Sequence, residues 1–598
     1  MESLLTGPLA GSLAGPLGKL ARQRTAPLIL ELDLTDGVIE TRPTDPLSAV
    51  MSRHQPTITD LLAGIKAART DDRVKALVVK VGGKAIGLGV VQELREAVKR
   101  FRDSGKPTWA WAETFGEFSA GNLPYYLATA SDTIFLQPSG DVGLTGLAVE
   151  RSFLRGTLDK LGVQIEVAAR HEYKSAAEQL TELGFSDPAR EATEQVAQSV
   201  TAHLKDAIAE HVRISPEEAD QLINGGPYVA EQALANRLVD ALGYRDEVYA
   251  AVRKQLGSEP ILLYVGRYQR SKELASRAKQ LTAPRPDAVA LIQAIGAIRR
   301  GRNGRSPLTG TAMGSDSITA ALRAATADPH IKAIVLRVNS PGGSYVASDA
   351  IWREVVRARN AGKPVVVSMS DVAASGGYFI SMAADAIVAQ PGTITGSIGV
   401  ISGKPVLSDM LGKVGVTTDS VVVGQHAAMF STSRPFSSEE WQIVDSWLDR
   451  IYADFTGKVA AGRGLPAERV HELARGRVWT GADAHERKLV DELGGLEDAA
   501  EIARRRAGLP ATAPLVHYPK LTPLERIRPA ASSEDRRAAA AAYATAGPLS
   551  QLADLGDAAS AAGVALLAES WGPVWQLAAR CGLPAAGPLL LPGSWTFH

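Results

Sequence analysis

The sequence has a single cysteine, Cys581, among its 598 residues, so no disulfide can form within the chain. Nothing in the fold therefore requires an oxidising compartment. Net charge is missing too, because 65 lysines and arginines balance 65 aspartates and glutamates. Without a net field, charge alone is not expected to bring the chain to nucleic acid or to an acidic membrane.

Long hydrophobic runs are also absent. A membrane-spanning helix needs about twenty consecutive apolar residues, and no such run occurs, so we predict no transmembrane span. The first 24 residues have no basic region before their apolar part and are interrupted by Pro8 and Pro16, so we expect no signal peptide. These features favour a cytoplasmic protein or one that associates peripherally with a membrane.

Metal and nucleotide motifs are a third absence. The sequence contains no C-x-x-C, no H-E-x-x-H and no Walker loop. The glycine-rich stretch 82–89 fits no phosphate-binding pattern. We therefore predict no metal, no nucleotide and no other cofactor.

What the sequence does contain is an internal repeat, in which the second half resembles the first. Five collinear segments recur at offsets between 251 and 257 residues, and such small drifts are typical of loop insertions. The matching pairs are Tyr125–Pro138 with Tyr378–Pro391, Leu158–Val163 with Leu411–Val416, Val74–Val81 with Ile331–Val338, Gly105–Pro107 with Gly362–Pro364, and Leu238–Gly243 with Leu489–Gly494. The sequence therefore predicts two related domains.

Each half alternates apolar strand-like runs with helical patterns, which predicts an α/β fold with a parallel sheet and covering helices. Helices are expected at 187–212 and 437–461 by the same repetition. The predicted organisation is an N-terminal segment (1–25), a first repeat (26–257), a linker (258–286), a second repeat (287–519) and a tail rich in Ala, Gly and Pro (520–598) that is mostly helical or irregular, with a helix at 558–579.

The stretch from Pro364 to Gly399 is the centre of the second repeat. A buried strand at 364–369 is expected to lead through a short turn into a helix at 376–384. Ser375 stands at that turn, beside the free N–H groups and the positive end of the helix dipole. This is a suitable place to stabilise an oxyanion, although a serine there is also an ordinary N-cap.

The two copies differ in a complementary way. On the offset of 253 residues, Ser375 falls opposite Asn122, and Lys174 falls opposite Ala427. Each half therefore supplies a group that the other lacks. A purely structural duplication has no need of this pattern, whereas one site built from Ser375 and Lys174 explains it.

Such a pair permits nucleophilic catalysis. A serine hydroxyl needs a base, and a lysine can be that base when burial lowers the pKa of its amine. The oxyanion would be bound by the backbone N–H groups of Gly376 and Gly342, supported by Gly343 and Gly377 in the same glycine pairs. Either Ser397 or Ser402 could orient the lysine side chain.

Two alternatives remain open at this point. Lys174 could be an ordinary surface lysine, since most lysines are exposed. A histidine could be the base instead, because His171 is near Lys174 in sequence and His426 lies next to the equivalent position of the second half. Asp371 would then complete a Ser-His-Asp arrangement.

These motifs resemble those of a known family. The segments N-S-P-G-G, S-D-V-A-A-S-G-G-Y and G-T-I-T-G-S-I-G-V, with Y-K-S-A in the first half, resemble the long form of the signal peptide peptidase A family, also called protease IV. The likeness covers roughly residues 26–520. It implies two tandem Clp/crotonase-like domains, Ser375 as nucleophile, Lys174 as general base, cleavage of released signal peptides within apolar segments, and a homotetramer.

The leading hypothesis is therefore a serine endopeptidase that acts on apolar peptides through an acyl-enzyme, since the expected cleft residues 372–374 are apolar or small. A crotonase-like acyl-CoA enzyme shares the fold but does not need Ser375 or Lys174. An inactive scaffold for membrane proteins is the third class. Long-form members often carry an N-terminal membrane anchor, and none is expected here.

Overall fold

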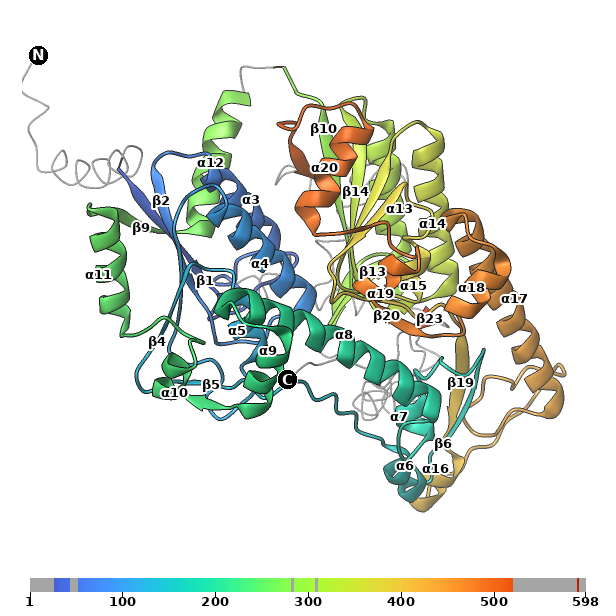
Figure 1. Cartoon of the computed structure of the whole chain (residues 1–598). Coiled ribbons are helices and arrows are strands. Elements are labelled where there is room, and N and C mark those ends of the chain that lie inside the picture. Colours follow the sequence, from blue (N-terminus) through green and yellow to red (C-terminus); the bar gives the residue numbers. More distant parts are fainter. Residues whose placement is uncertain (1–25, 43–51, 281–283, 307–309, 520–588, 591–598) are drawn as a thin grey trace, which may run out of the picture.

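The computed structural model describes residues 26–42, 52–280, 284–306, 310–519 and 589–590 of the chain (Figure 1). The expected N-terminal segment and the expected tail helix at 558–579 lie outside these residues. Within them, no helix combines the length and the apolar character needed to cross a bilayer.

The first half is built on a six-stranded parallel sheet whose order is β9-β1-β2-β3-β4-β8. The strands are β1 (Leu28–Asp33), β2 (Val74–Lys80), β3 (Thr108–Ala112), β4 (Thr133–Leu136), β8 (Ala241–Leu242) and β9 (Ile261–Tyr264). The connections between β1 and β4 run through α3 (Ile58–Arg69), α4 (Leu88–Arg102) and α5 (Asn122–Ala128).

The second half repeats this order as β22-β10-β14-β16-β17-β21, again parallel throughout. Its strands are β10 (Ala288–Ile295), β14 (Ile331–Ser340), β16 (Val365–Ala374), β17 (Ala386–Ala389), β21 (Glu492–Leu493) and β22 (Leu515–His517). The expected α/β fold with two tandem repeats is thereby confirmed.

The segment expected as a linker forms regular structure. β9 adds to the edge of the first sheet beside β1, as β22 adds beside β10 in the second. α12 (Val265–Gln280) follows β9 and packs on α3, where a methyl group at Gly64 would lie only 2.8 Å from the Val265 side chain. The domain boundaries themselves stay a prediction.

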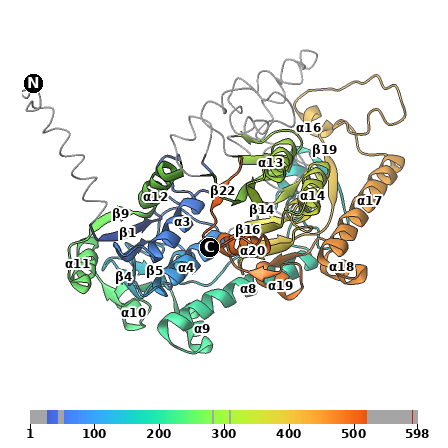
Figure 2. The ribbon, with the colours of Figure 1, turned by 90° about the horizontal axis from the view of Figure 1, so that it is seen from above.

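The centre of the second sheet is buried on both faces. Val365, Val366 and Val367 have no exposed surface, and burying each such side chain stabilises the fold by roughly 1.5–3 kcal/mol. One face is covered by α13 (Ser315–Ala327) and α14 (Tyr345–Asn360), and the other by α20 (Leu496–Arg506). α3 and α4 of the first half also join that second layer, so they lie between the two sheets in both views (Figure 1 and Figure 2).

A second connection between the halves lies at one end of the molecule. β6 (Gln164–Ala169) of the first half pairs antiparallel with β19 (Ile401–Val406) of the second over six residue pairs. The long helix α8 (Asp187–Val212) runs from the first sheet towards this ribbon and contacts β20 (Val478–Thr480) of the second half (Figure 1). Both halves therefore contribute to the region beyond the end of β16.

Two elements at the centre differ from expectation. β16 does not turn after Met369 but continues to Ala374, pairing first with β17 and then with β18 (Ile394–Gly396). The following helix, α15 (Gly376–Phe379), ends at Phe379 rather than at residue 384. The expected helices match more closely elsewhere, since α8 has the expected bounds and α17 spans Ser438–Arg463.

Candidate active site

Ser375 lies at the junction of β16 and α15 (Gly376–Phe379) in an uncommon backbone conformation. Its φ is +54° and its ψ is −112°, a region that residues other than glycine rarely occupy and that is often found at functional sites. The residue is fully buried, and its N–H donates to the Gly396 carbonyl at 2.8 Å. Its hydroxyl makes no capping bond with the helix, so the side chain is free for another partner.

That partner is Lys174. The Lys174 Nζ lies 2.9 Å from the Ser375 Oγ, 3.0 Å from the Ser397 Oγ and 2.9 Å from the Ser397 carbonyl oxygen. The lysine is not on the surface, because only 4% of it is exposed. Burial holds the pKa of its amine well below the usual value, since the ammonium form loses its hydration there. The amine is therefore biased towards its neutral form, which can accept a proton.

The close approach of Lys174 depends on two glycines of the second half. A Cβ atom at Gly476 would lie 2.5 Å from the Lys174 nitrogen, and one at Gly399 would lie 3.2 Å from its Cδ. The Tyr173 N–H donates to the Arg475 carbonyl at 3.1 Å. The lysine, which follows β6 in the chain, is thus held against a loop that precedes β20.

Arg477 also holds the Lys174 region against the loop that precedes β20. The sequence analysis did not single out this residue. Its guanidinium donates to the Tyr173 hydroxyl at 3.1 Å and to Gln195 Oε1 at 2.5 Å, and it forms an ion pair with Glu191 at 2.8 Å. Its carbonyl accepts the N–H of Ser397 at 2.7 Å. The comparison of the two copies could have found it, because the offset of 251 residues places Gly226 opposite Arg477.

The glycines expected near the serine come together. A Cβ atom at Gly376 would lie 3.0 Å from the Gly343 nitrogen and 3.1 Å from the Gly342 Cα. One at Gly377 would lie 2.6 Å from the Ser340 carbonyl oxygen. The Gly342 N–H donates to the Ser340 Oγ at 3.2 Å. Two glycine pairs therefore approach each other directly beside Ser375, with backbone amide groups at the contact.

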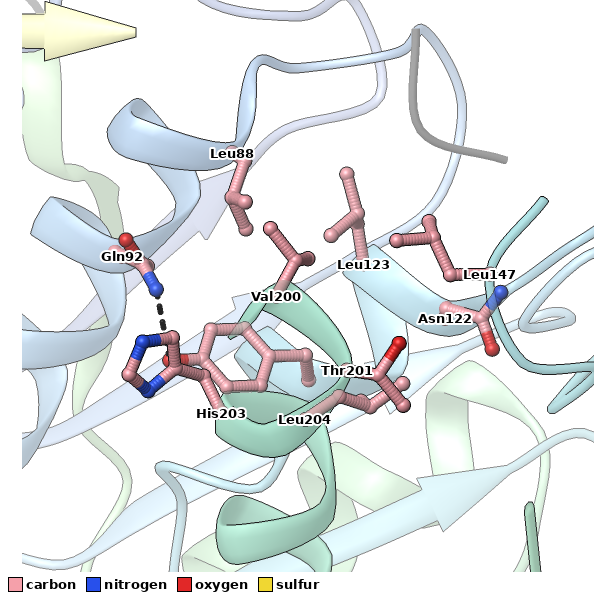
Figure 3. Close-up of a pocket in the computed structure, with 10 residues that line it drawn as sticks. Leu88, Gln92, Asn122, Leu123, Leu147, Val200, Thr201, His203 and Leu204 are labelled. Carbon is pink, nitrogen blue, oxygen red and sulfur yellow. Dashed lines mark hydrogen bonds between the residues drawn. The ribbon is translucent and has the colours of Figure 1, made fainter. Parts of the chain in front are cut away.

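The equivalent place in the first half is occupied differently. Asn122 begins α5 there; its amide donates to the Gly146 carbonyl at 2.7 Å and its oxygen accepts the Thr145 N–H at 3.2 Å. The adjacent pocket, drawn in Figure 3, has a volume of about 20 Å³, little more than one water molecule requires. Half of its lining residues are leucine or valine and half carry a polar group: Leu88, Gln92, Asn122, Leu123, Tyr126, Leu147, Val200, Thr201, His203 and Leu204.

The histidine alternative finds no support in the geometry. The His171 ring packs against Tyr452 and His471, with ring centres 4.5 Å and 4.9 Å apart, while His426 is exposed. Asp371 accepts the N–H of Val90 at 3.0 Å. Among the described residues, no hydrogen bond joins either histidine to Ser375.

Ser402, the other residue considered for orienting the lysine, lies within β19 and pairs with Ala168.

A buried charge cluster links the two halves beneath the strand that leads to Ser375. Arg337 on β14 has no exposed surface and forms ion pairs with Glu93 of α4 at 2.7 Å and with Glu40 at 3.0 Å. It also donates to Ser368 and Ser370 of β16, each at 2.9 Å. The first half therefore neutralises a charge in the core of the second, which ties β16 to α4.

Comparison with known proteins finds matches in both halves of the chain. The family model described as "Peptidase family S49" matches residues 100–259 and 357–510, one region in each half, and the "Clp protease" model matches residues 310–392. The chain is 33% identical to "Serine protease SPPA, chloroplastic" of Arabidopsis thaliana over 473 residues, which cover 79% of this chain and 68% of that protein.

Two bacterial proteins are similar to the same extent. "Protease 4" of Salmonella typhi is 33% identical over 506 residues, covering 81% of this chain and 79% of that protein. "Protease 4" of Haemophilus influenzae is 31% identical over 497 residues, covering 80% and 78%. The expected family resemblance and the Clp-like fold are thereby confirmed.

Proposed function

Because this chain belongs to peptidase family S49 and is a serine-type peptidase, we propose that it is an endopeptidase in which Ser375 is the nucleophile and Lys174 the general base. The observation that carries this proposal is the buried Lys174 amine at 2.9 Å from the Ser375 hydroxyl. No salt bridge of the described residues includes Lys174, so no carboxylate there opposes the effect of burial on its protonation.

The reaction follows from the direction of proton transfer. The neutral Lys174 amine takes the proton of Ser375, and the Ser375 Oγ attacks the carbonyl carbon of the scissile bond. The negative charge that forms on the carbonyl oxygen is stabilised by the N–H groups of Gly376 and Gly342. The C–N bond then breaks, and the Lys174 ammonium returns its proton to the leaving amine.

Deacylation reuses the same groups. A water molecule attacks the acyl-enzyme ester while Lys174 again accepts a proton, and collapse of the second tetrahedral intermediate releases Ser375. Ser397 orients the base, because its hydroxyl and its carbonyl both accept hydrogen bonds from the Lys174 Nζ. Gly343 and Gly377 serve the site through their small size, since side chains there would collide with backbone atoms.

We propose apolar peptides as substrates, with signal peptides already released from their proteins as the natural class. Support comes from the family likeness and from the small or apolar residues at the end of β16, such as Ala373 and Ala374. A homotetramer and a peripheral association with the membrane belong to the same proposal, on the family likeness alone.

The experiment compares wild type with Ser375→Ala and Lys174→Ala on a fluorogenic apolar peptide and on an unfolded protein. Removing a nucleophile or its base is expected to lower kcat/KM by at least about a thousandfold. The matched control is Lys363→Ala. Lys363 also donates to two backbone carbonyls, and burial also lowers the pKa of its amine, but it lies at the opposite end of β16.

Each outcome has a distinct meaning. Loss of activity in both site variants, with Lys363→Ala close to wild type, supports the proposed pair. An active Lys174→Ala would reject lysine as the base and bring His171 forward. A wild type that cleaves neither substrate would reject endopeptidase activity on these substrates.

A further inference from the structure

A short segment near the C-terminus lies on the glycine strand beside Ser375. Leu589–Leu590 form β23, which pairs antiparallel with β15 (Gly342–Gly343) so that Leu590 is opposite Gly342 and Leu589 is opposite Gly343. The other edge of β15 is already taken by β11 (Ala297–Arg299), through the pairing of Ile298 with Gly343. β23 therefore occupies the one remaining edge of β15.

This edge is where an extended peptide would have to bind to reach the serine. A Cβ atom at Gly376 would lie only 3.0 Å from the Gly343 nitrogen and 3.1 Å from the Gly342 Cα, and Gly376 directly follows Ser375 in the chain. Strand addition to an exposed edge is a common way to hold an extended peptide, because the backbone supplies the hydrogen bonds whatever the side chains are. A substrate strand on this edge and β23 would therefore occupy the same place beside Gly342 and Gly343.

We infer that the segment around Leu589–Leu590 is an intramolecular ligand of the peptide-binding edge and competes with substrate for it. The inference rests on the proposed function for the identity of the competitor, a peptide substrate. The segment also indicates which ligands this edge of β15 would bind, namely extended apolar peptides that pair antiparallel with β15.

The sequence of the segment fits a ligand that can be displaced. Its residues are Gly-Pro-Leu-Leu-Leu-Pro from 587 to 592, which is as apolar as the substrates proposed above. The paired residues are Leu589 and Leu590, and the nearby Pro588 and Pro592 have no N–H group with which to extend the pairing. A ladder this short is weak, and a free peptide can replace it.

Tethering sets the size of the effect. A ligand that belongs to the same chain as its site acts at an effective concentration set by the length of the connecting segment, on the order of millimolar where that segment can span the distance. If the segment binds with a dissociation constant of similar magnitude or somewhat below it, a free peptide would appear to bind about three to ten times more weakly than to an empty edge. Disrupting the segment should therefore strengthen peptide binding by that factor.

The first test measures binding without catalysis, in full-length Ser375→Ala protein. The probe is a fluorescein-labelled peptide with the segment's own sequence, Ala-Ala-Gly-Pro-Leu-Leu-Leu-Pro, and the disrupted variant adds Leu589→Asp and Leu590→Asp. The control adds Leu566→Asp and Leu567→Asp instead, which places the same charges on another leucine pair of the tail. Tighter binding only in the first variant supports the inference, and equal affinities in all three proteins overturn it.

The second test is kinetic, in chains that keep Ser375. Leu589→Asp with Leu590→Asp should lower KM about three- to tenfold and leave kcat unchanged, as loss of a competitive ligand requires. An unchanged KM in this variant contradicts the inference. If no chain cleaves any peptide, the proposed function fails, while the binding test still decides whether the segment occupies the edge.

Discussion

The Lys174 Nζ and the Ser375 Oγ are 2.9 Å apart although 201 residues separate them in the chain. Lys174 reaches this position only through contacts with the other half. Ser375 is placed by the end of β16, whereas Lys174 is placed by the pairing of β6 with β19 across the two halves. The geometry of the pair therefore depends on the junction between the two halves, where β6 pairs with β19.

The rate of peptide hydrolysis should rise with pH as Lys174 loses its proton. Only the neutral amine can accept the proton of Ser375, and burial lowers the pKa of this amine from its usual value of 10.5. The rise in kcat/KM should therefore be complete well below that value. A pH–rate profile with a single ascending limb checks this, and a rate that is independent of pH would contradict the role of Lys174.

Stability should also depend on pH through Lys174. Its pKa is lowered in the folded protein, so between the folded and the unfolded pKa the unfolded chain binds more protons, and stability rises with pH. Lys174→Met lacks this contribution. Urea midpoints measured from about pH 6 to pH 10 should increase more steeply with pH for wild type than for the variant, and equal slopes would show that the amine is not buried in its neutral form.

Arg477 should act as a positioning residue. Arg477→Met removes its bonds to Tyr173, Glu191 and Gln195 and should lower kcat about ten- to a hundredfold, because a misplaced base costs rate even when it remains present. Steady-state kinetics and the pH–rate profile are the measurements, and the ascending limb should shift as the surroundings of Lys174 change.

The matched control for this change is Arg487→Met. Arg477 and Arg487 both stack on Trp479, with their guanidinium groups 4.7 Å and 4.2 Å from the ring centre. Within the described residues, the Arg487 side chain otherwise bonds to Asp483 and Glu486, which belong to its own half. Its loss should leave kcat nearly unchanged. A decrease of the same size in both variants would assign the effect of Arg477 to Trp479 rather than to Lys174.

The buried cluster should matter for stability. Glu93→Gln leaves Arg337 in the core with only Glu40 as a charged partner, and breaking a buried ion pair costs about 3–5 kcal/mol. Chemical unfolding measures this cost. The repeat supplies the control in Glu113→Gln, because Lys80 stands opposite Arg337 in the first half and its pair with Glu113 is more exposed. Glu113→Gln should lower the free energy of unfolding by about 0–1 kcal/mol. Equal losses in Glu113→Gln and Glu93→Gln would contradict the larger role of the buried pair.

Sequence reasoning reached the repeated fold and the complementary residues for one reason: the chain contains its own comparison. Asn122 opposite Ser375 and Ala427 opposite Lys174 mark which positions diverged. The same comparison applied to charged residues would have pointed to Arg477. The distance between Ser375 and Lys174 was not predictable, since it depends on how β6 pairs with β19 far along the chain.

The end of β16 was misjudged for a physical reason. The residues Ser370 and Asp371 are polar, which is typical of a turn, and the sequence does not show that Arg337 and the N–H of Val90 satisfy them. Once these partners are supplied from β14 and α4, the strand can continue to Ala374. Long-range polar contacts of this kind have no fixed spacing and leave no local pattern.

The division of labour between the two copies has an evolutionary consequence. An ancestral unit that worked alone would have needed both its hydroxyl and its amine, and two fused copies would first have carried each group twice. With Asn122 in one copy and Ala427 in the other, neither half carries both groups of the proposed pair. Under that proposal, deleting either half or replacing it with a second version of the other would remove the nucleophile or the base.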